Sequence, residues 1–297
     1  MQGSPYRPFC EKNGADWDGI MTETPIAFYK MSGSGNDFIV IDNRDGVVGE
    51  KHLSRWIASV CRRKRAVGAD GLILIETSER ADFKWRYFNA DGGEAEMCGN
   101  GGRCVARLAH LMGIAGPRLS LETQTGVIQA EITDKRVKLE MPQPSTVDLD
   151  YPLQVGGETL TVSSVTVGVP HVVVWVSDLD TAAVFKMGRA IRYHAHYAPA
   201  GTNVDFVQPL DDGTLAIRTY ERGVEDETLA CGTGSVAAAL VASAKGRVTS
   251  PAALRTRGGE CLKIHFARQG DGFRGVFLEG DARVIYEGRL WKEATGG

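Results

Sequence analysis

The chain has 297 residues, about twice the length of a typical domain, so it has room for two domains of ordinary size. Its formal net charge of -3 argues against nucleic acid or an anionic membrane surface as a partner. No apolar run approaches the ~20 residues that cross a bilayer. Six cysteines without any CxxC spacing favour neither a disulfide framework nor a structural zinc site, and they fit free thiols in a reducing cytoplasm.

The N-terminal segment differs in composition from the rest of the chain. Residues 1–25 mix acidic, basic and aromatic side chains and lack the apolar centre of a signal peptide. We expect a disordered extension here, with Met21 as a candidate internal start.

The first half predicts short strands and two helices. Apolar residues at helical spacing indicate an amphipathic helix within 50–64, with Cys61 on its apolar face. The basic run 62–65 would complement the C-terminus of that helix. A second helix is expected after Cys98, with Cys104 packed inside it and Gly113 as its C′ residue. The other elements expected here are a turn at 33–37 and strands at 38–41, 72–75, 83–88, 119–122, 126–132 and 137–141.

The second half repeats this plan. A helix is expected over about 181–192. The run 236–244 is almost entirely small and apolar, so it predicts a helix surrounded by protein, as inside a curved sheet. The expected strands are 161–167, 172–176, 204–208, 215–220, 262–266, 274–278 and 282–286. Many short strands with one central helix per half predict an α+β class.

The domain boundaries follow from this order of elements. The proline-containing segment 141–144 is interpreted as the crossing between the halves. We therefore expect one domain over 26–142 and a second over 143–282. A last strand within 283–292 is expected to rejoin the first domain.

Two cysteines open the same short phrase, one in each half. Cys98 begins Cys-Gly-Asn-Gly, Cys231 begins Cys-Gly-Thr-Gly, and each phrase leads into a predicted helix. The preceding segments also match, in the pairs 87–89 with 219–222 and 35–38 with 202–206. One such phrase alone would suggest only a half-buried cysteine after a glycine-rich turn. Two matching phrases indicate a duplicated domain, with each thiol beside a helix N-terminus that favours an anion.

Two facing thiols without metal-ligand spacing suit acid–base chemistry on opposite faces of one carbon. A thiolate removes a proton from one side while the opposite thiol delivers one, so the centre inverts. The helix starts present the backbone N–H groups of Gly99, Asn100, Gly232 and Thr233. Those donors could hold a substrate carboxylate and stabilise the charge that develops on the carbon.

Six motifs in the same order resemble the diaminopimelate epimerase family over about residues 26–288. They are GNDF at 35–38, FNADG at 88–92, CGNG at 98–101, PH at 170–171, YERG at 220–223 and ACGTG at 230–234. The resemblance implies a cofactor-independent isomerase that interconverts LL- and meso-diaminopimelate for lysine and peptidoglycan synthesis. It also implies two similar pseudo-symmetric domains, each a curved, mostly antiparallel sheet around a central helix. The active site would lie in the cleft between the domains, and the enzyme would usually be a homodimer.

The resemblance also implies roles for individual residues. Cys98 and Cys231 would be the catalytic acid and base, with His171 and Glu221 orienting the reacting groups and tuning the thiols. The residues implied to hold the substrate are Asn36, Asn89, Asn203, Glu221 and Arg222, with the backbone of Gly99, Asn100, Gly232 and Thr233 around its reacting carboxylate. Two positions depart from several family members. Gly71 stands where some carry a glutamine that contacts substrate, and Val169 stands where many carry an asparagine.

Three other functions remain open from the residues alone. A sister racemase of the same duplicated fold would act on proline, hydroxyproline or another amino acid. A cysteine-nucleophile hydrolase would pair one thiol with His171 and form a covalent acyl intermediate, which leaves the second thiol unexplained. A non-enzymatic redox or binding protein would join the two cysteines when oxidised.

Overall fold

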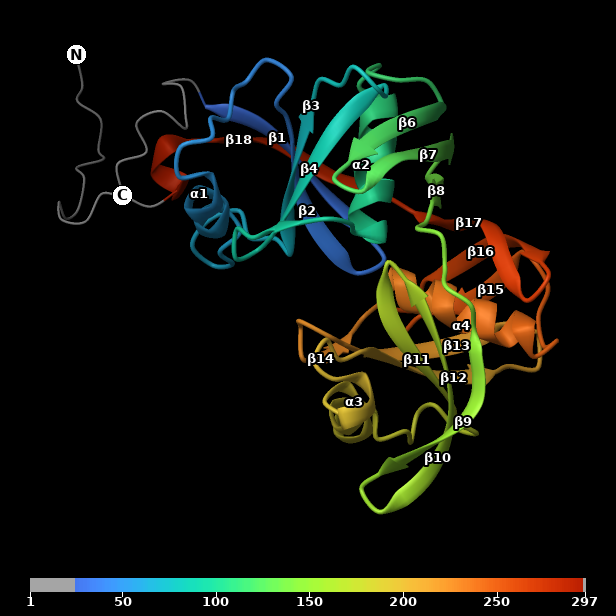
Figure 1. Ribbon diagram of the computed structural model, residues 1–297. Helices are drawn as coiled ribbons and strands as arrows, with labels where there is room; N and C mark the ends of the chain where they lie inside the picture. Colours follow the sequence, from blue (N-terminus) through green and yellow to red (C-terminus); the bar gives the residue numbers. More distant parts are fainter. Residues whose placement is uncertain (1–24, 296–297) are drawn as a thin grey trace, which may run out of the picture.

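The computed structural model describes residues 25–295, whose strands join into one continuous mixed sheet of 18 strands. The sheet curves into two lobes, each wrapped around one helix, α2 in the upper lobe of Figure 1 and α4 in the lower. The predicted fold class, two similar sheets each around a central helix, is confirmed. The expected N-terminal extension lies outside the described residues apart from Pro25.

Each lobe is built from one copy of a repeated unit. The elements of the first copy are β1 (Ile26–Gly33), β2 (Asn36–Asp42), α1 (Leu53–Val60), β3 (Gly71–Glu76), β4 (Phe83–Asn89), β5 (Glu94–Ala95), α2 (Gly99–Leu111), β6 (Arg118–Thr123), β7 (Gly126–Thr133) and β8 (Arg136–Glu140). Those of the second are β10 (Glu158–Val167), β11 (Val169–Trp175), α3 (Val184–Arg192), β12 (Asn203–Pro209), β13 (Leu215–Glu221), β14 (Asp226–Thr228), α4 (Gly232–Ala244), β15 (Ala252–Arg255), β16 (Cys261–Gln269) and β17 (Gly272–Asp281). Strands β9 (Asp148–Val155) and β18 (Arg283–Leu290) and the short helices η1 (Ala195–Tyr197) and η2 (Lys292–Thr295) lie outside the repeat.

The registers of the paired strands show which residues of the two copies correspond. Strands β2 and β3 run parallel with Phe38 opposite Gly71, and β11 and β12 run parallel with His171 opposite Asn203. Phe38 is therefore the counterpart of His171, and Gly71 that of Asn203. The expected match of 35–38 with 202–206 is wrong, because those segments belong to non-equivalent strands, β2 and β12.

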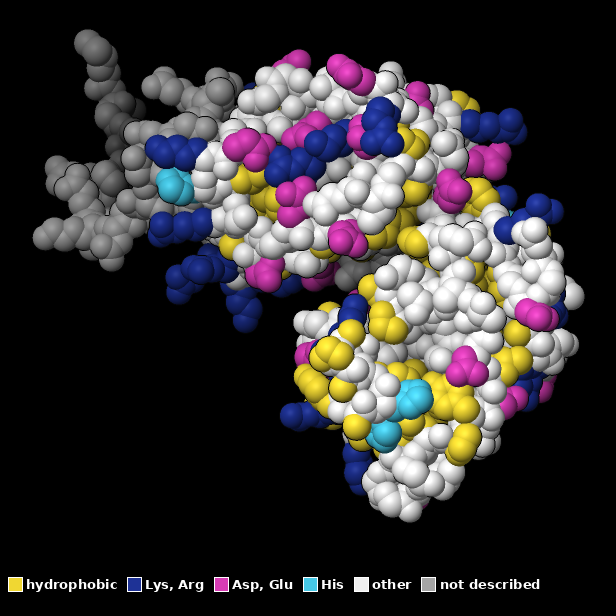
Figure 2. Space-filling view, viewed as in Figure 1, with side chains coloured by type: hydrophobic (Ala, Val, Ile, Leu, Met, Phe, Trp, Pro, Cys, Tyr) yellow, Lys and Arg dark blue, Asp and Glu magenta, His cyan; other side chains and the backbone are white. Residues whose placement is uncertain are grey.

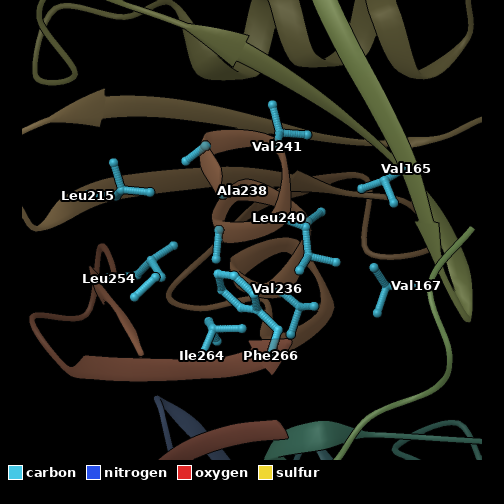
Figure 3. Packing of buried hydrophobic residues seen from close by; sticks show 14 of the residues in the cluster. Val165, Val167, Leu215, Val236, Ala238, Leu240, Val241, Leu254, Ile264 and Phe266 are labelled. Carbon is cyan, nitrogen blue, oxygen red and sulfur yellow. The ribbon is translucent and has the colours of Figure 1, made fainter. Parts of the chain in front are cut away.

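Helix α4 is enclosed by its lobe. All of its residues are buried except the second and the last. Figure 3 shows its side chains pointing outward toward strands that surround the helix. The labelled partners on those strands are Val165, Val167, Leu215, Leu254, Ile264 and Phe266. The prediction that 236–244 lies inside a curved sheet is confirmed, because an all-apolar helix of small residues can be close-packed on every side.

The outer helices α1 and α3 cover the opposite faces of the two sheets. Helix α1 is shorter than the expected 50–64, since it starts only after His52, which has a left-handed backbone conformation (φ 60°). The basic run 62–65 begins directly after the C-cap residue Cys61, at the C-terminal end of α1. Arg63 of this run also pairs with Asp37 and Asp70.

Two strands join the lobes. Strand β17 pairs with β16 of its own lobe and with β8 of the other. Strand β18 then returns to the first lobe and pairs antiparallel with β1. Segment 141–147, between β8 and β9, carries the chain from one lobe to the other. Within residues 25–295 no helix is long and apolar enough to cross a membrane.

Candidate active site

Cys98 and Cys231 occupy the N-cap positions of α2 and α4. Both residues have extended backbone conformations, with φ of -146° and -114°. Each sulfur accepts a hydrogen bond from the N–H group three residues later, at 3.4 Å from Gly101 and 3.4 Å from Gly234. The thiols thus act as the capping acceptors of two otherwise unsatisfied helix starts.

The two helix starts meet at the junction of the lobes. A Cβ atom placed on Gly232 would lie 3.9 Å from Cα of Gly99, so the two backbones approach closely. Leu278 of β17 packs against both glycines, with Cδ2 at 3.2 and 3.0 Å from the positions that their Cβ atoms would take. Figure 2 shows the lobes separated by a notch on the left of the view. The structure therefore brings the two N-cap cysteines to the same junction.

Burial is the largest influence on the pKa of both the Cys98 and the Cys231 thiol. It raises the pKa of Cys98, against the lowering effect of the Gly101 N–H group, and the charge of Glu221 raises it further. Burial also raises the pKa of Cys231 well above its usual value, and Glu221 and Asp205 add to the increase. Raised pKa values favour the neutral thiol, so a cysteine that is to work as a base here needs a nearby proton acceptor.

Glu221 ends β13 and influences both thiols electrostatically. Burial raises the pKa of this carboxyl above its ordinary value. A carboxylate with a raised pKa is a better proton acceptor, which suits the expected tuning role.

His171 is 1% exposed and lies between two partners. Its Nδ1 atom is 2.8 Å from Oδ2 of Asp205, and its Nε2 atom is 2.9 Å from Oγ1 of Thr233. The Thr233 hydroxyl in turn lies 3.5 Å from the sulfur of Cys231. The side chain of Asp205 is fully buried and also accepts a hydrogen bond from the Thr219 hydroxyl at 2.7 Å.

Asp205 was not predicted as a site residue. The one signal in the sequence is a carboxylate between apolar neighbours in a predicted strand, at Val204-Asp205-Phe206. A charged residue on the inner face of such a strand is seldom buried without a specific partner.

Two of the expected substrate-binding asparagines hold other parts of the protein. Asn36 donates to Oδ2 of Asp70 at 3.1 Å and accepts from the amide of Asn100 at 2.7 Å. Asn203 donates to the carbonyl of Pro170 at 3.1 Å and accepts from the backbone N–H group of Arg222 at 2.8 Å. These amides fix the loops around the junction of the lobes.

The remaining predicted residues lie at strand ends nearby. Asn89 is exposed at the end of β4, and its Oδ1 atom accepts a hydrogen bond from the Tyr87 hydroxyl at 2.9 Å. Arg222 is half-buried and donates to the carbonyl of Ala200 at 3.1 Å. Gly71 lies beneath Tyr87, whose Cε2 atom would be 2.6 Å from a Cβ at that position.

The other described cysteines have different surroundings. Cys61 and Cys104 are buried, and burial raises the pKa of each to about 12, so the prediction that they are packing residues is confirmed. Cys261 is exposed on β16. Across residues 25–295, no group of three or more His, Cys, Asp or Glu side chains is placed to hold a metal ion.

A family model described as diaminopimelate epimerase matches residues 28–147 and 163–285. The chain belongs to the diaminopimelate epimerase family. A diaminopimelate epimerase from Aquifex aeolicus is 46% identical over 279 residues, which cover 90% of this chain and 99% of the relative. One from Chlorobaculum tepidum is 45% identical over 264 residues, covering 88% and 99%. This is an isomerase family, and the resemblance carried by the six motifs is confirmed.

Solved structures share the fold of this diaminopimelate epimerase family member at low sequence identity. A PhzF-family phenazine biosynthesis protein from Bacillus anthracis superposes with a TM-score of 0.70 at 15% identity, covering 89% of this chain and 98% of that one. A probable proline racemase from Agrobacterium radiobacter K84 gives 0.67 at 16% identity, with 91% and 96% covered. These likenesses concern the two-lobed fold alone.

Proposed function

We propose that the chain is a cofactor-independent epimerase that converts LL-diaminopimelate into meso-diaminopimelate, with Cys98 and Cys231 as its acid–base pair. The observation that carries this proposal is the close approach of two helix starts, each capped by a cysteine, at one junction between duplicated lobes. The names of relatives at 45–46% identity support the choice of substrate.

In the proposed reaction, the thiolate of one cysteine takes the proton from the α-carbon, and the thiol of the other gives its proton to the opposite face. The electron pair released by the C–H bond spreads into the neighbouring carboxylate and then forms the new C–H bond. The two starting N–H groups of each helix would stabilise that charge, in the manner of an oxyanion hole. Each turnover leaves the first cysteine protonated and the second ionised, so the reverse reaction starts from the product side.

The supporting residues follow the same proposal. Glu221 and His171 would accept the protons that the thiols release on activation. We assign substrate holding to Asn36, Asn89, Asn203 and Arg222, and the planar guanidinium suits bidentate capture of the distal carboxylate. Asn36 and Asn203 are engaged with protein groups, so their contribution would come through the loops that they position.

The test uses purified LL-diaminopimelate in D2O. The wild-type protein should place deuterium at one α-carbon of the product, without a pyridoxal absorbance. Cys98→Ala and Cys231→Ala should each lose epimerisation by a factor of about 10³ or more while keeping the wild-type melting temperature. Proline and hydroxyproline serve as control substrates. Turnover of these and not of diaminopimelate would replace the proposal with a sister racemase.

We also propose a homodimer, a cytoplasmic setting and two domains, 26–142 with 283–292 and 143–282. Three neighbouring apolar residues of β18 are exposed in the single chain, Val284, Ile285 and Tyr286, at 37%, 55% and 46%. Apolar side chains grouped on one strand favour a protein partner, here a second copy. Sedimentation velocity should give twice the chain mass, and Ile285→Asp should shift it toward the monomer.

A further inference from the structure

A chain of hydrogen bonds leads from Cys231 into the interior of the second lobe. Its members are Cys231, Thr233, His171 and Asp205, joined at 3.5, 2.9 and 2.8 Å. The side chains of His171 and Asp205 are fully buried, so water does not compete for these contacts. We call these four residues the Cys231 relay.

With Asp205 ionised and His171 neutral, the donors and acceptors of the relay have one consistent order. An ionised Asp205 can only accept, so His171 must donate its Nδ1–H to it. In a neutral imidazole Nε2 is then the acceptor, and the Thr233 hydroxyl must donate to it. The hydroxyl has no second hydrogen, so the Cys231 thiol donates to Oγ1 of Thr233. Every hydrogen in the relay therefore points away from the sulfur and toward the buried carboxylate of Asp205.

The first lobe supplies an internal comparison. By the strand registers, Phe38 takes the place of His171 and Ile73 that of Asp205. Asn100, two residues after Cys98, takes the place of Thr233. The repeated fold is thus stable with apolar groups at the two buried positions, and a buried carboxylate and imidazole are costly substitutes for them. Packing does not explain their presence in the second lobe.

The helix start accommodates the charge of Asp205. Its Oδ1 atom would lie 2.3 Å from a Cβ on Gly234, whereas the equivalent Gly101 faces Cδ1 of Ile73 at 3.2 Å. Only a glycine lets the carboxylate approach α4 this closely. The positive end of the helix dipole and the Thr219 hydroxyl then stabilise the anion.

We propose that Thr233 carries protons between Cys231 and His171, and that Asp205 is the positioning residue that makes His171 their acceptor. In activation, the S–H bond of Cys231 breaks and its proton joins Oγ1 of Thr233. The original hydroxyl proton of Thr233 moves to Nε2 of His171, and Nδ1–H stays bonded to Asp205. The products are a thiolate and an imidazolium, and Thr233 is unchanged. The reverse transfer restores the thiol.

The relay gives the two thiols different means of activation. Burial opposes ionisation of Cys231, so a nearby acceptor is required. Cys98 has an apolar environment at the equivalent positions and lies beside the phenol of Tyr87 and the charge of Glu221. This inference rests on the proposed function for its catalytic meaning, while the relay itself can be tested on the thiols alone.

The test compares Thr233→Val, which keeps the shape and removes the hydroxyl, with Thr233→Ser, which keeps the hydroxyl. Iodoacetamide reacts with thiolates, and peptide mass spectrometry reports each cysteine separately. In Thr233→Val the alkylation rate of Cys231 should fall by about tenfold or more, with Cys98 within twofold of wild type as the internal control. Thr233→Ser should restore the rate at Cys231. Wild-type alkylation of Cys231 in folded Thr233→Val would overturn the relay.

A second variant acts at the far end of the relay. Asp205→Asn keeps the size and removes the charge, and it should slow alkylation of Cys231 without changing Cys98. In turnover, Thr233→Val and Asp205→Asn should lower kcat by about 10²-fold with KM within about threefold. Equal slowing at both cysteines would indicate a general structural effect and reject the relay. Failure of the wild-type protein to label diaminopimelate would reject the proposed function instead, and the alkylation contrast would still decide the relay.

Discussion

The position of the Tyr87 ring requires a residue without a side chain at position 71. The ring of Tyr87 lies where a side chain at position 71 would be, with Cε2 at 2.6 Å from the point that a Cβ there would occupy. Its hydroxyl then reaches Oδ1 of Asn89 at 2.9 Å, and burial, with Cys98 adjacent, raises its pKa. The phenol stays protonated and donates to the Asn89 amide, which leaves the NH2 group of that amide free to turn outward.

Tyr87→Phe should therefore weaken catalysis more than folding. Loss of this hydrogen bond frees Asn89 to rotate, and we expect kcat/KM to fall by about tenfold, roughly 1.4 kcal/mol. The melting temperature should change little, because the ring still packs over Gly71. Steady-state kinetics with Tyr193→Phe, an exposed tyrosine outside the proposed interface, as the control would check this. Unchanged kinetics would remove Tyr87 from the site.

The ion pairs of Asp37 with Lys30 and Arg63 make the free energy of unfolding depend on pH. It lies 2.7 Å from Lys30, and Arg63 also pairs with it. Burial raises the pKa of Asp37, but hydrogen bonds and charge from Arg63 and Lys30 outweigh it and lower the pKa to about 2. Because the folded value lies below the ordinary value of 3.8, the ionised group stabilises the fold above that pH. This contribution is lost as the pH falls through about 2.

Asp37→Asn should lower the free energy of unfolding at pH 7 by about 1 kcal/mol, after allowance for screening of a partly exposed group by water. Urea unfolding at pH 7, 4 and 2 would measure the difference between variant and wild type. The difference should narrow between pH 4 and 2. A constant difference over this range would show that the carboxylate charge is not its cause.

The sequence predicts some site residues and misses others for a physical reason. Cys98 and Cys231 stand in matching phrases, and His171 stands in one of the six motifs that carry the family resemblance, so the sequence is enough to propose them. Asp205 and Tyr87 gain their roles from neighbours distant in the chain. His171 is 34 residues from Asp205, and Gly71 meets the ring of Tyr87 only through the pairing of β3 with β4.

At the scale of elements, composition predicted the buried position of α4 correctly, whereas the similarity of short segments did not identify which strands of the two repeats are equivalent. A helix without a polar face can only be interior, and this one is. The match of 35–38 with 202–206 failed because similar residues begin β2 in one repeat and β12 in the other. Turn residues report local geometry, whereas strand order depends on pairing across the whole lobe.

The enclosure of α4 gives a direct stability prediction. Leu240 is fully buried among strands, whereas Leu111 at the end of α2 is 55% exposed. Leu240→Ala should cost about 2–5 kcal/mol, since it leaves a cavity among strands that cannot collapse. Leu111→Ala, the same change in a helix, should cost less than about 0.5 kcal/mol. Similar costs for both in denaturant titrations would contradict the enclosed position of α4.

At the scale of the molecule, the last strand of the chain lies beside the first strand. Strand β18 pairs with β1 over most of its length, and Leu290 packs with Ile26 and Phe28 in the core beside α1. The first lobe is therefore incomplete until the end of the chain has been made. No local pattern in 26–142 predicts this requirement, although the last strand, within 283–292, was expected to rejoin the first domain.

Removing residues 283–297 should destabilise the first lobe selectively. The loss exposes one edge of β1 and part of the α1 core, so hydrogen exchange should rise across β1, β2 and α1 and much less across α4. A chain ending at 290 keeps all of β18 and serves as the control. Equal protection in the two truncated chains would show that β18 is dispensable.

Gly99 and Gly232 meet beside Leu278 with almost no side chain between their backbones. A side chain added at either glycine would press on Cδ2 of Leu278 and push apart the two helix starts, together with the cysteines that cap them. Under the proposed function, the spacing of the two sulfur atoms therefore depends on two positions that carry no side chain.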